Sequence, residues 1–289
     1  MDRHYGNGDR KPAAASGGGP LERLEIELLL QGLYAWCGYD FRNYSYSSVR
    51  RRIWNRVHRE NVSTITGLLD KVLHDPACLK RLIADFSIHV TEMFRDPEFF
   101  RLFREEVVPV LRTYPSIRIW HAGCSTGEEV YSMAILLHEE GLYERAKIYA
   151  TDISADVLVT AKAGMFPLEK MRKYTVNYQR AGGTGEFSNY YQVENGRVRI
   201  KPFLVRNIVF AQHNLVTDRS FNEFHVILCR NVFIYFNREL QERVLRLFYD
   251  SLVMFGHLGL GDKETLEYLP LGDRFEEVGK GRKLYRKIR

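Results

Sequence analysis

Apolar residues recur with a helical period in the first third of the chain. Val49, Ile53 and Val57 stand four residues apart, as on one face of a helix, and further patterns of this kind follow. We therefore predict a small helical domain over residues 21–88. Residues 1–20 are rich in Gly, Ala, Pro and charged side chains, and this composition predicts a disordered tail.

Strand-like and helix-like patterns alternate from residue 113 onward. Ile117 and Ile119 belong to an apolar alternating run that enters a glycine-containing turn, and a helical pattern begins at Val130. This alternation predicts an α/β fold with a mostly parallel sheet over residues 113–289, which binds ligands at the carboxyl ends of its strands. We expect further strands at 148–151, 224–229 and 258–261, an amphipathic helix over 238–255, and a closing hairpin from 275–278 and 283–288.

One segment interrupts this alternation. Residues 187–193 and 197–204 alternate with period two around Asn195-Gly196, a dipeptide that strongly favours a hairpin turn. We predict a small antiparallel β-subdomain inserted at about residues 180–206. It is either a surface decoration or an edge to which a partner peptide adds as an extra strand.

Residues 89–112 connect the two predicted domains. Asp96-Pro97 is typical of a helix start, because Pro is favoured in the first turn, and the helical pattern continues to about Leu111. We predict that this helix covers the ligand site of the domain that follows.

Positive charge gathers in one part of the helical region. The chain of 289 residues has a net charge of +6, and the stretch from Phe41 to Arg59 holds six arginines and no acid. On a helix, Arg52, Arg56 and Arg59 lie beside the apolar face. Such a run is either a solvated surface or a face that binds an acidic partner. Nucleic acid is a weaker interpretation, since the nearby aromatic residues form no obvious stacking platform.

The cysteines and the apolar runs exclude several classes of protein. The four cysteines form no C-x-x-C pair, which predicts free thiols and no metal site. No apolar run reaches the length of a membrane span, and no signal peptide opens the chain. We expect a cytoplasmic protein without membrane insertion.

The turn after the first predicted strand contains the first candidate chemistry. Gly123 to Gly127 fits neither a P-loop, which needs a Lys where Glu128 stands, nor a G-x-G-x-x-G fingerprint. Small residues here let the backbone approach a ligand, and two carboxylates disfavour a pyrophosphate. S-adenosylmethionine, with hydroxyls, an amine and a cation, suits such a turn. The alternative is an ordinary tight turn without a ligand.

Polar residues at other strand ends add to this site. Asp152 is either a ribose ligand or a helix N-cap, and Glu129 either contacts the cofactor or favours the helix N-terminus through the dipole. Arg95 and Arg230 could orient a carboxylate between two guanidiniums. The alternatives are a structural ion pair for Arg230 and simple aromatic packing for Tyr235.

Four ordered motifs then resemble one family. They are His89–Arg95 with Asp96-Pro97, Trp120–Ser132, Thr151–Ile153 and Cys229–Phe236. Together they resemble the chemotaxis receptor methyltransferases of the CheR type. The resemblance implies an N-terminal helical domain and a Rossmann-like class I methyltransferase domain with an inserted β-subdomain. It further implies methyl transfer from S-adenosylmethionine to chemoreceptor glutamates, which tunes receptor adaptation and leaves S-adenosylhomocysteine.

The resemblance also implies roles for individual residues. It makes Arg95, Arg230 and Tyr235 catalytic candidates, and we expect Arg52, Arg56 and Arg59 to grip acidic receptor helices. A receptor C-terminal peptide is a second candidate partner, at the inserted hairpin, and the enzyme is expected to be a monomer. The expected cofactor contacts are His89, Thr91, Arg95, Gly123, Glu129, Asp152, Asn214, Leu215, Arg230 and Asn231.

Some positions depart from the family pattern. His89 stands where Asn is usual, Met93 where Phe is usual, and Gly123 where Ala is common. Gly261–Glu264 reads G-D-K-E in place of G-H-S-E. Two other functions stay open: a non-catalytic sensor of the cofactor or its product, and a methyltransferase for a non-receptor protein or a small carboxylic acid.

Overall fold

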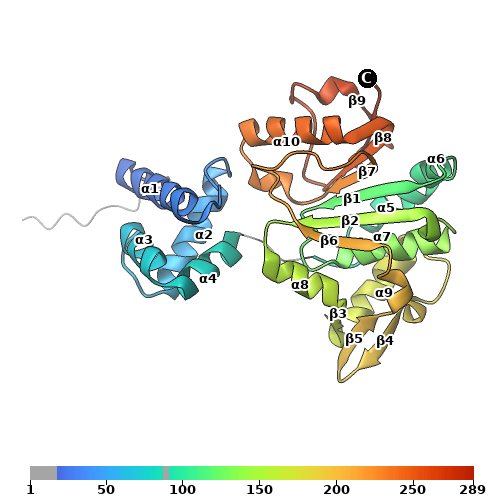
Figure 1. The fold of residues 1–289 in the computed structure, drawn as a ribbon, viewed down its shortest axis with the longest axis horizontal. Coiled ribbons are helices and arrows are strands. Elements are labelled where there is room, and N and C mark those ends of the chain that lie inside the picture. Colours follow the sequence, from blue (N-terminus) through green and yellow to red (C-terminus); the bar gives the residue numbers. More distant parts are fainter. Residues whose placement is uncertain (1–17, 87–90) are drawn as a thin grey trace, which may run out of the picture. The chain divides into compact units, whose positions relative to one another are not determined.

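The computed structural model describes residues 18–86 and 91–289, which form two compact units (Figure 1). The first contains the described residues up to Arg42 together with Arg50–Leu82. The second contains Asn43–Val49 and Ile83–Arg289. The predictions for residues 1–17 and for His89 lie outside the described residues.

The N-terminal region is helical, as predicted. Val49, Ile53 and Val57 of α2 are all buried. Thr64 caps α3 by accepting a hydrogen bond of 2.9 Å from the amide of Gly67. The helices are α1 (Pro20–Cys37), α2 (Tyr46–Arg59), α3 (Ile65–His74) and α4 (Pro76–Phe86).

The second unit is built on a seven-stranded sheet of order β6-β2-β1-β7-β8-β10-β9 (Figure 1). The pairs from β6 to β8 are parallel and β10 is antiparallel to both of its neighbours, which confirms the predicted mostly parallel sheet. Its strands are β1 (Ile117–Ala122), β2 (Ala146–Asp152), β6 (Ile208–Gln212), β7 (Phe224–Cys229), β8 (Leu252–Leu260), β9 (Phe275–Val278) and β10 (Leu284–Lys287).

Hydrophobic cores lie on both faces of this sheet. In β1, Ile117 and Ile119 belong to one core and Trp120 to the other, as the alternation of side chains in a strand requires. The helices of this unit are α5 (Pro97–Leu102), the π-helix η1 (Phe103–Val107), α6 (Val108–Leu111), α7 (Glu128–Glu139), α8 (Ala155–Ala163), α9 (Met171–Arg180) and α10 (Arg238–Ser251).

The predicted helix over 238–255 is wrong at its C-terminal end. Helix α10 ends at Ser251, and β8 begins at the next residue. The Nζ of Lys287 donates to the carbonyls of Tyr249 (2.8 Å) and Leu252 (2.9 Å) and so satisfies acceptors at the helix end. The apolar period of the helix continues into the strand, which is why the pattern missed the boundary.

The inserted hairpin is confirmed, and its sheet has one strand more than predicted. β4 (Tyr191–Glu194) and β5 (Arg197–Ile200) pair around Asn195 and Gly196, whose φ values are 47° and 73°. β3 (Met165–Pro167) adds to the other edge of β5. A strand of three residues is too short to carry a period-two signal, so β3 was not predicted.

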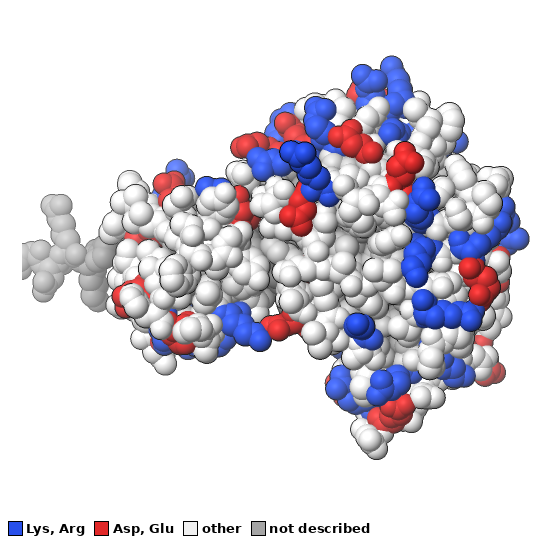
Figure 2. All heavy atoms as spheres, viewed as in Figure 1, with Lys and Arg blue, Asp and Glu red and all other residues white. Residues whose placement is uncertain are grey.

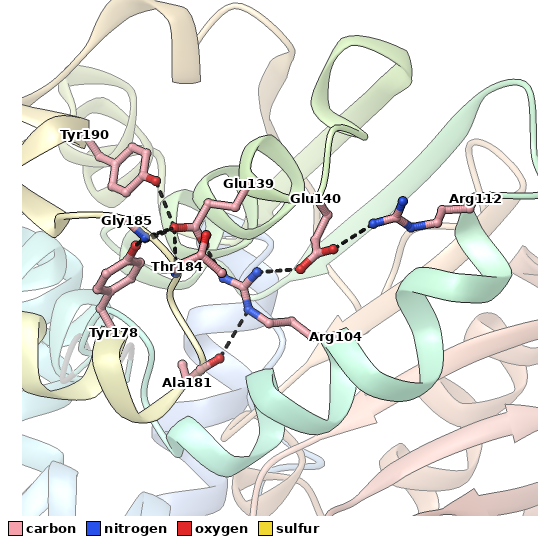
Figure 3. Close-up of polar contacts among 9 residues, drawn as sticks. All are labelled: Arg104, Arg112, Glu139, Glu140, Tyr178, Ala181, Thr184, Gly185 and Tyr190. Carbon is pink, nitrogen blue, oxygen red and sulfur yellow. Dashed lines mark hydrogen bonds and ion pairs between the residues drawn. The ribbon is translucent and has the colours of Figure 1, made fainter.

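A carboxylate attaches this insertion to the domain (Figure 3). Glu139 at the end of α7 is paired with Arg104 of η1, and it accepts hydrogen bonds from Tyr178 and Tyr190 (2.8 Å). The same carboxylate accepts from the amide of Gly185 at 3.3 Å. One buried side chain therefore joins η1, α9 and the loop that leads into the subdomain.

The surface carries both signs of charge. On the face drawn in Figure 2, Lys and Arg side chains lie among Asp and Glu side chains. Among the described residues, no helix is both long and apolar enough to cross a membrane.

His257 in β8 makes stability dependent on pH. Its side chain is buried, and burial together with the charge of Arg286 lowers its pKa to about 4. In the unfolded chain its pKa is near ~6.5, so the unfolded state binds more protons between these values. Acidification from pH 6.5 to 4 should therefore lower the unfolding free energy by up to about 3 kcal/mol. Calorimetry of His257→Gln should show a flatter decline, whereas the exposed-site control His138→Gln should keep the wild-type slope.

Candidate functional site

A cleft opens at the carboxyl ends of β1, β2 and β7. Its empty volume is about 1010 Å³, part of which is open to solvent, and all of its lining residues belong to the second unit. The sequence-predicted residues that line it are Thr91, Arg95, Gly123, Glu129, Asp152, Asn214, Leu215, Arg230, Asn231 and Tyr235.

The turn between β1 and α7 is held in a left-handed backbone. Gly123, Ser125 and Gly127 have φ values of 80°, 50° and 93°. A Cβ on Gly123 would lie 2.6 Å from Val232 Cγ2, so a side chain here would push the neighbouring loop away. The glycine thus serves close packing of two segments of the cleft wall.

Asp152 fixes this turn from the end of β2. Its Oδ2 accepts from the amide of Ser125 (2.9 Å), and its Oδ1 accepts from the amide of Ser154 (3.0 Å). The N-cap position of α8 is Ser154, not Asp152. The carboxylate of Asp152 also lines the cleft, and acceptor oxygens of this kind suit ligand hydroxyls.

Glu129 is shared between two partners in the cleft wall. Its Oε1 lies 3.0 Å from His121 Nδ1, and its Oε2 accepts from Arg230 Nη1 at 2.9 Å. Burial opposes ionisation of Glu129, but the hydrogen bond from His121 and the charge of Arg230 outweigh it and lower its pKa. A carboxylate that stays ionised is suited to bind the hydroxyls or the amine of a nucleoside ligand.

Arg230 is buried among protein partners. Its side chain is 1% exposed, Nη2 donates to Asp96 Oδ2 (2.8 Å) and to the Arg95 carbonyl (3.2 Å), and the guanidinium lies 4.2 Å from the Phe99 ring centre. These contacts match the ion-pair alternative. They favour a role for Arg230 in positioning Glu129 and the Arg95 segment rather than in gripping a substrate carboxylate.

Arg95 sits in a tight turn at the cleft. Its neighbours Phe94 and Asp96 have φ values of 52° and 55°. The amide of Phe94 donates to Ser132 Oγ (2.8 Å), and its ring makes edge contacts with Phe100 and other aromatic side chains. This anchoring holds a strained backbone in place and presents Arg95, which is partly exposed, to the cleft.

Tyr235 ends the short helix η6 (Phe233–Tyr235) and also lines the cleft. Its carbonyl accepts from the amide of Ser45 (2.7 Å), and Tyr44 forms an isolated bridge with Phe236. The segment 43–49 therefore packs on the loop that carries Tyr235.

Sequence reasoning missed several lining residues. Ile153 and His213 directly adjoin Asp152 and Asn214, so their position at strand ends was a usable signal. Tyr44 reaches the cleft from a distant part of the chain, which no local pattern indicates. Cys124 and Ser125 line the cleft as part of the predicted turn, and the missed residues are Tyr44, Phe86, Ile153, His213, Val216, Val232 and Phe236.

The arginines of α2 do not form a uniformly exposed face. Arg59 is exposed, whereas Arg52 and Arg56 are buried. Arg56 pairs with Glu60 at 3.1 Å, and Glu60 has its pKa lowered to about 2 by its hydrogen bonds from Arg81, Lys71 and Arg56. The arginine run therefore has an acidic partner within the chain, because Glu60 follows it directly. A receptor-binding role for Arg52, Arg56 and Arg59 stays a prediction.

The parallel sheet, the turn with its two glutamates and the acidic end of β2 define a Rossmann-like methyltransferase. Residues 89–282 match the family description "CheR methyltransferase, SAM binding domain", and residues 24–87 match "CheR methyltransferase, all-alpha domain". The chain belongs to the CheR methyltransferase family.

The chain is also similar to individual bacterial proteins. The chain is 48% identical over 264 residues to Cher3 of Pseudomonas putida, covering 91% of this chain and 97% of that protein. It is 27% identical over 266 residues to chemotaxis protein methyltransferase 1 of Pseudomonas aeruginosa, covering 88% and 94%. A 104.1 kDa protein of Rhodobacter capsulatus is 31% identical over 258 residues, and the match spans 86% of this chain and 26% of that protein.

Removing the buried cation should destabilise the domain. In Arg230→Met the carboxylate of Glu129 loses its cation, which should lower the unfolding free energy by about 3–5 kcal/mol. Urea denaturation measures this loss, and the double variant Arg230→Met/Glu129→Gln should recover part of it. Arg238→Met, whose side chain is 70% exposed, should change stability by less than about 0.5 kcal/mol. Equal effects at both arginines would contradict the structural role.

Proposed function

We propose that this protein transfers the methyl group of S-adenosylmethionine to glutamate side chains of chemoreceptors, forming methyl esters and S-adenosylhomocysteine. The observation that carries the proposal is the cleft itself, in which Arg95 stands on an anchored turn beside two fixed carboxylates, Glu129 and Asp152. Family membership supplies the cofactor class.

The cleft residues fit this cofactor. Asp152 and Glu129 are acceptors for ribose hydroxyls and for an amine, and both lie at the end of the sheet where nucleosides bind. Leu215, Val216 and Ile153 give the cleft an apolar wall that suits a base. When bound, S-adenosylmethionine supplies an electrophilic methyl group on a sulfonium.

The substrate carboxylate needs no general base, because a glutamate is ionised at neutral pH. Its oxygen forms a bond to the methyl carbon while the carbon–sulfur bond breaks and the electron pair stays on sulfur. One negative and one positive charge disappear in this step. The protein therefore has to exclude water and align the partners, and alignment can contribute roughly 7–11 kcal/mol.

Arg95 orients the incoming carboxylate in this proposal, with Tyr235 lining the transfer path. Arg230 has an indirect role: its hydrogen bonds hold the backbone carbonyl of Arg95 and the carboxylates of Asp96 and Glu129 in place. A tight grip on the carboxylate would reduce its nucleophilicity, so orientation serves the reaction better than strong binding.

The partner is proposed to be a cytoplasmic receptor helix with acidic residues, met by a monomer of this enzyme in the cytoplasm. Of the three arginines expected to bind the receptor, Arg59 is exposed, whereas Arg52 and Arg56 are buried. A receptor tail peptide is a second proposed partner, at β4, which is an edge strand of the small sheet.

Replacing Arg95 should separate catalysis from cofactor binding. In Arg95→Ala, methyl transfer from tritiated cofactor to receptor-enriched membranes should fall by about 100-fold, because alignment of the carboxylate is lost. Calorimetric affinity for S-adenosylhomocysteine should change by less than about 10-fold. Arg101→Ala, an exposed arginine in α5, is the matched control and should keep normal turnover. Unchanged turnover in Arg95→Ala would refute the role of Arg95.

The chemistry of the product tests the substrate class. A methyl ester should release its label as volatile methanol in mild base. Label that survives base would indicate N-methylation, and no label on any receptor fragment would reject the proposed substrate.

A further inference from the structure

A buried carboxylate outside the predicted site holds the loop that follows β7. Glu264 lies after β8 and is 3% exposed. Its Oε2 accepts from the amides of Asn231 (2.9 Å) and Gly261 (2.5 Å), and its Oε1 accepts from the amide of Ile234 (3.1 Å). Three backbone donors from two loops thus converge on one side chain.

The loop that Glu264 holds has an unfavourable backbone. Asn231 has a φ of 62°, in the left-handed region that L residues rarely adopt. Asn tolerates this conformation better than most L residues, and contacts with its surroundings stabilise it further. The hydrogen bond from the Asn231 amide to Glu264 is one such stabilising contact.

Gly261 allows the two loops to come this close. A Cβ at this position would lie 2.6 Å from Asn231 Nδ2 and 2.7 Å from the Asn231 amide nitrogen. Residue 261 therefore has to lack a side chain. Gly261 and Glu264 together form a binding surface for the backbone of the opposite loop.

We propose that Glu264 is a positioning residue that sets the geometry of the loop carrying Arg230, Asn231 and Tyr235. Through this loop it determines the affinity of the cleft for the cofactor and the rate of methyl transfer. The inference rests on the proposed function in placing the reaction in this cleft, and it adds a residue from outside the cleft lining.

The chemistry of the side chain predicts a graded series of variants. Glu264→Gln keeps one oxygen, which can still accept from Asn231 and Gly261, but it turns an NH₂ group toward the Ile234 amide, where donor meets donor. Glu264→Ala removes all three acceptors. The loss should therefore be larger for Ala than for Gln.

The experiment compares cofactor affinity with global stability. We expect the dissociation constant for S-adenosylhomocysteine, measured by calorimetry, to rise about 10-fold in Glu264→Gln and more in Glu264→Ala. Hydrogen exchange should speed up at the amides of Asn231 and Ile234. Leu266→Ala is the control for general destabilisation, because Leu266 is buried two residues away and does not line the cleft. It should lower the melting temperature but change the dissociation constant less than 2-fold, and exposed Lys263→Ala should change neither.

Two results would overturn the proposal. One is wild-type affinity in both Glu264 variants at a temperature where they are folded. The other is an affinity loss in Leu266→Ala equal to that in Glu264→Gln at matched stability. Failure of the receptor proposal is recognised separately, since it would leave the binding of S-adenosylhomocysteine intact while no receptor fragment is labelled.

Discussion

The guanidinium of Arg230 joins the three segments that make the cleft. A buried cation is tolerated only when carboxylates or other acceptors surround it. Here Glu129 at the start of α7, Asp96 before α5 and the Arg95 carbonyl provide those acceptors, with the Phe99 ring on one side. The end of β7, the start of α7 and the turn before α5 are therefore fixed relative to one another by one charge. The turn that bears Arg95 owes its position to this arrangement as much as to the aromatic side chains beneath it.

This arrangement gives the two arginines of the cleft different tasks. The terminal nitrogens of Arg230 donate hydrogen bonds to protein groups, and its side chain is almost fully buried. Arg95, in contrast, is partly exposed on a turn at the cleft. The sequence alone does not distinguish the two arginines, since each is followed directly by an acidic or an amide residue. Only the contacts distinguish an arginine that builds the cleft wall from one that is partly exposed at the cleft. The same distinction separates Arg56, which pairs with Glu60, from Arg59 at the surface.

Much of the fold and of the cleft lining could be predicted from the sequence, because a parallel sheet brings the carboxyl ends of its strands to one edge. Asp152 and Arg230 were found in this way. The rest depends on contacts that no local period encodes. Strand β3 is too short to show alternation, and Tyr44 and Glu264 reach the site region from distant loops. The helix boundary at Ser251 was missed because the apolar period of α10 continues into β8, while the carbonyls at the helix end accept hydrogen bonds from Lys287, a residue near the end of the sequence.

The adjacent glutamates of the G-E-E motif show how one helix turn can serve two purposes. Both stand at the N-terminus of α7, where the helix dipole favours negative charge. Successive helical residues point about 100° apart, so they face different surroundings. Glu128 is 2% exposed, accepts from Thr126 Oγ1 (2.6 Å), and has its pKa raised by burial. Glu129 lines the cleft and has its pKa lowered by His121 and Arg230 against the effect of burial. The first glutamate therefore stabilises the turn from inside the domain, and the second presents an ionised acceptor to the cleft.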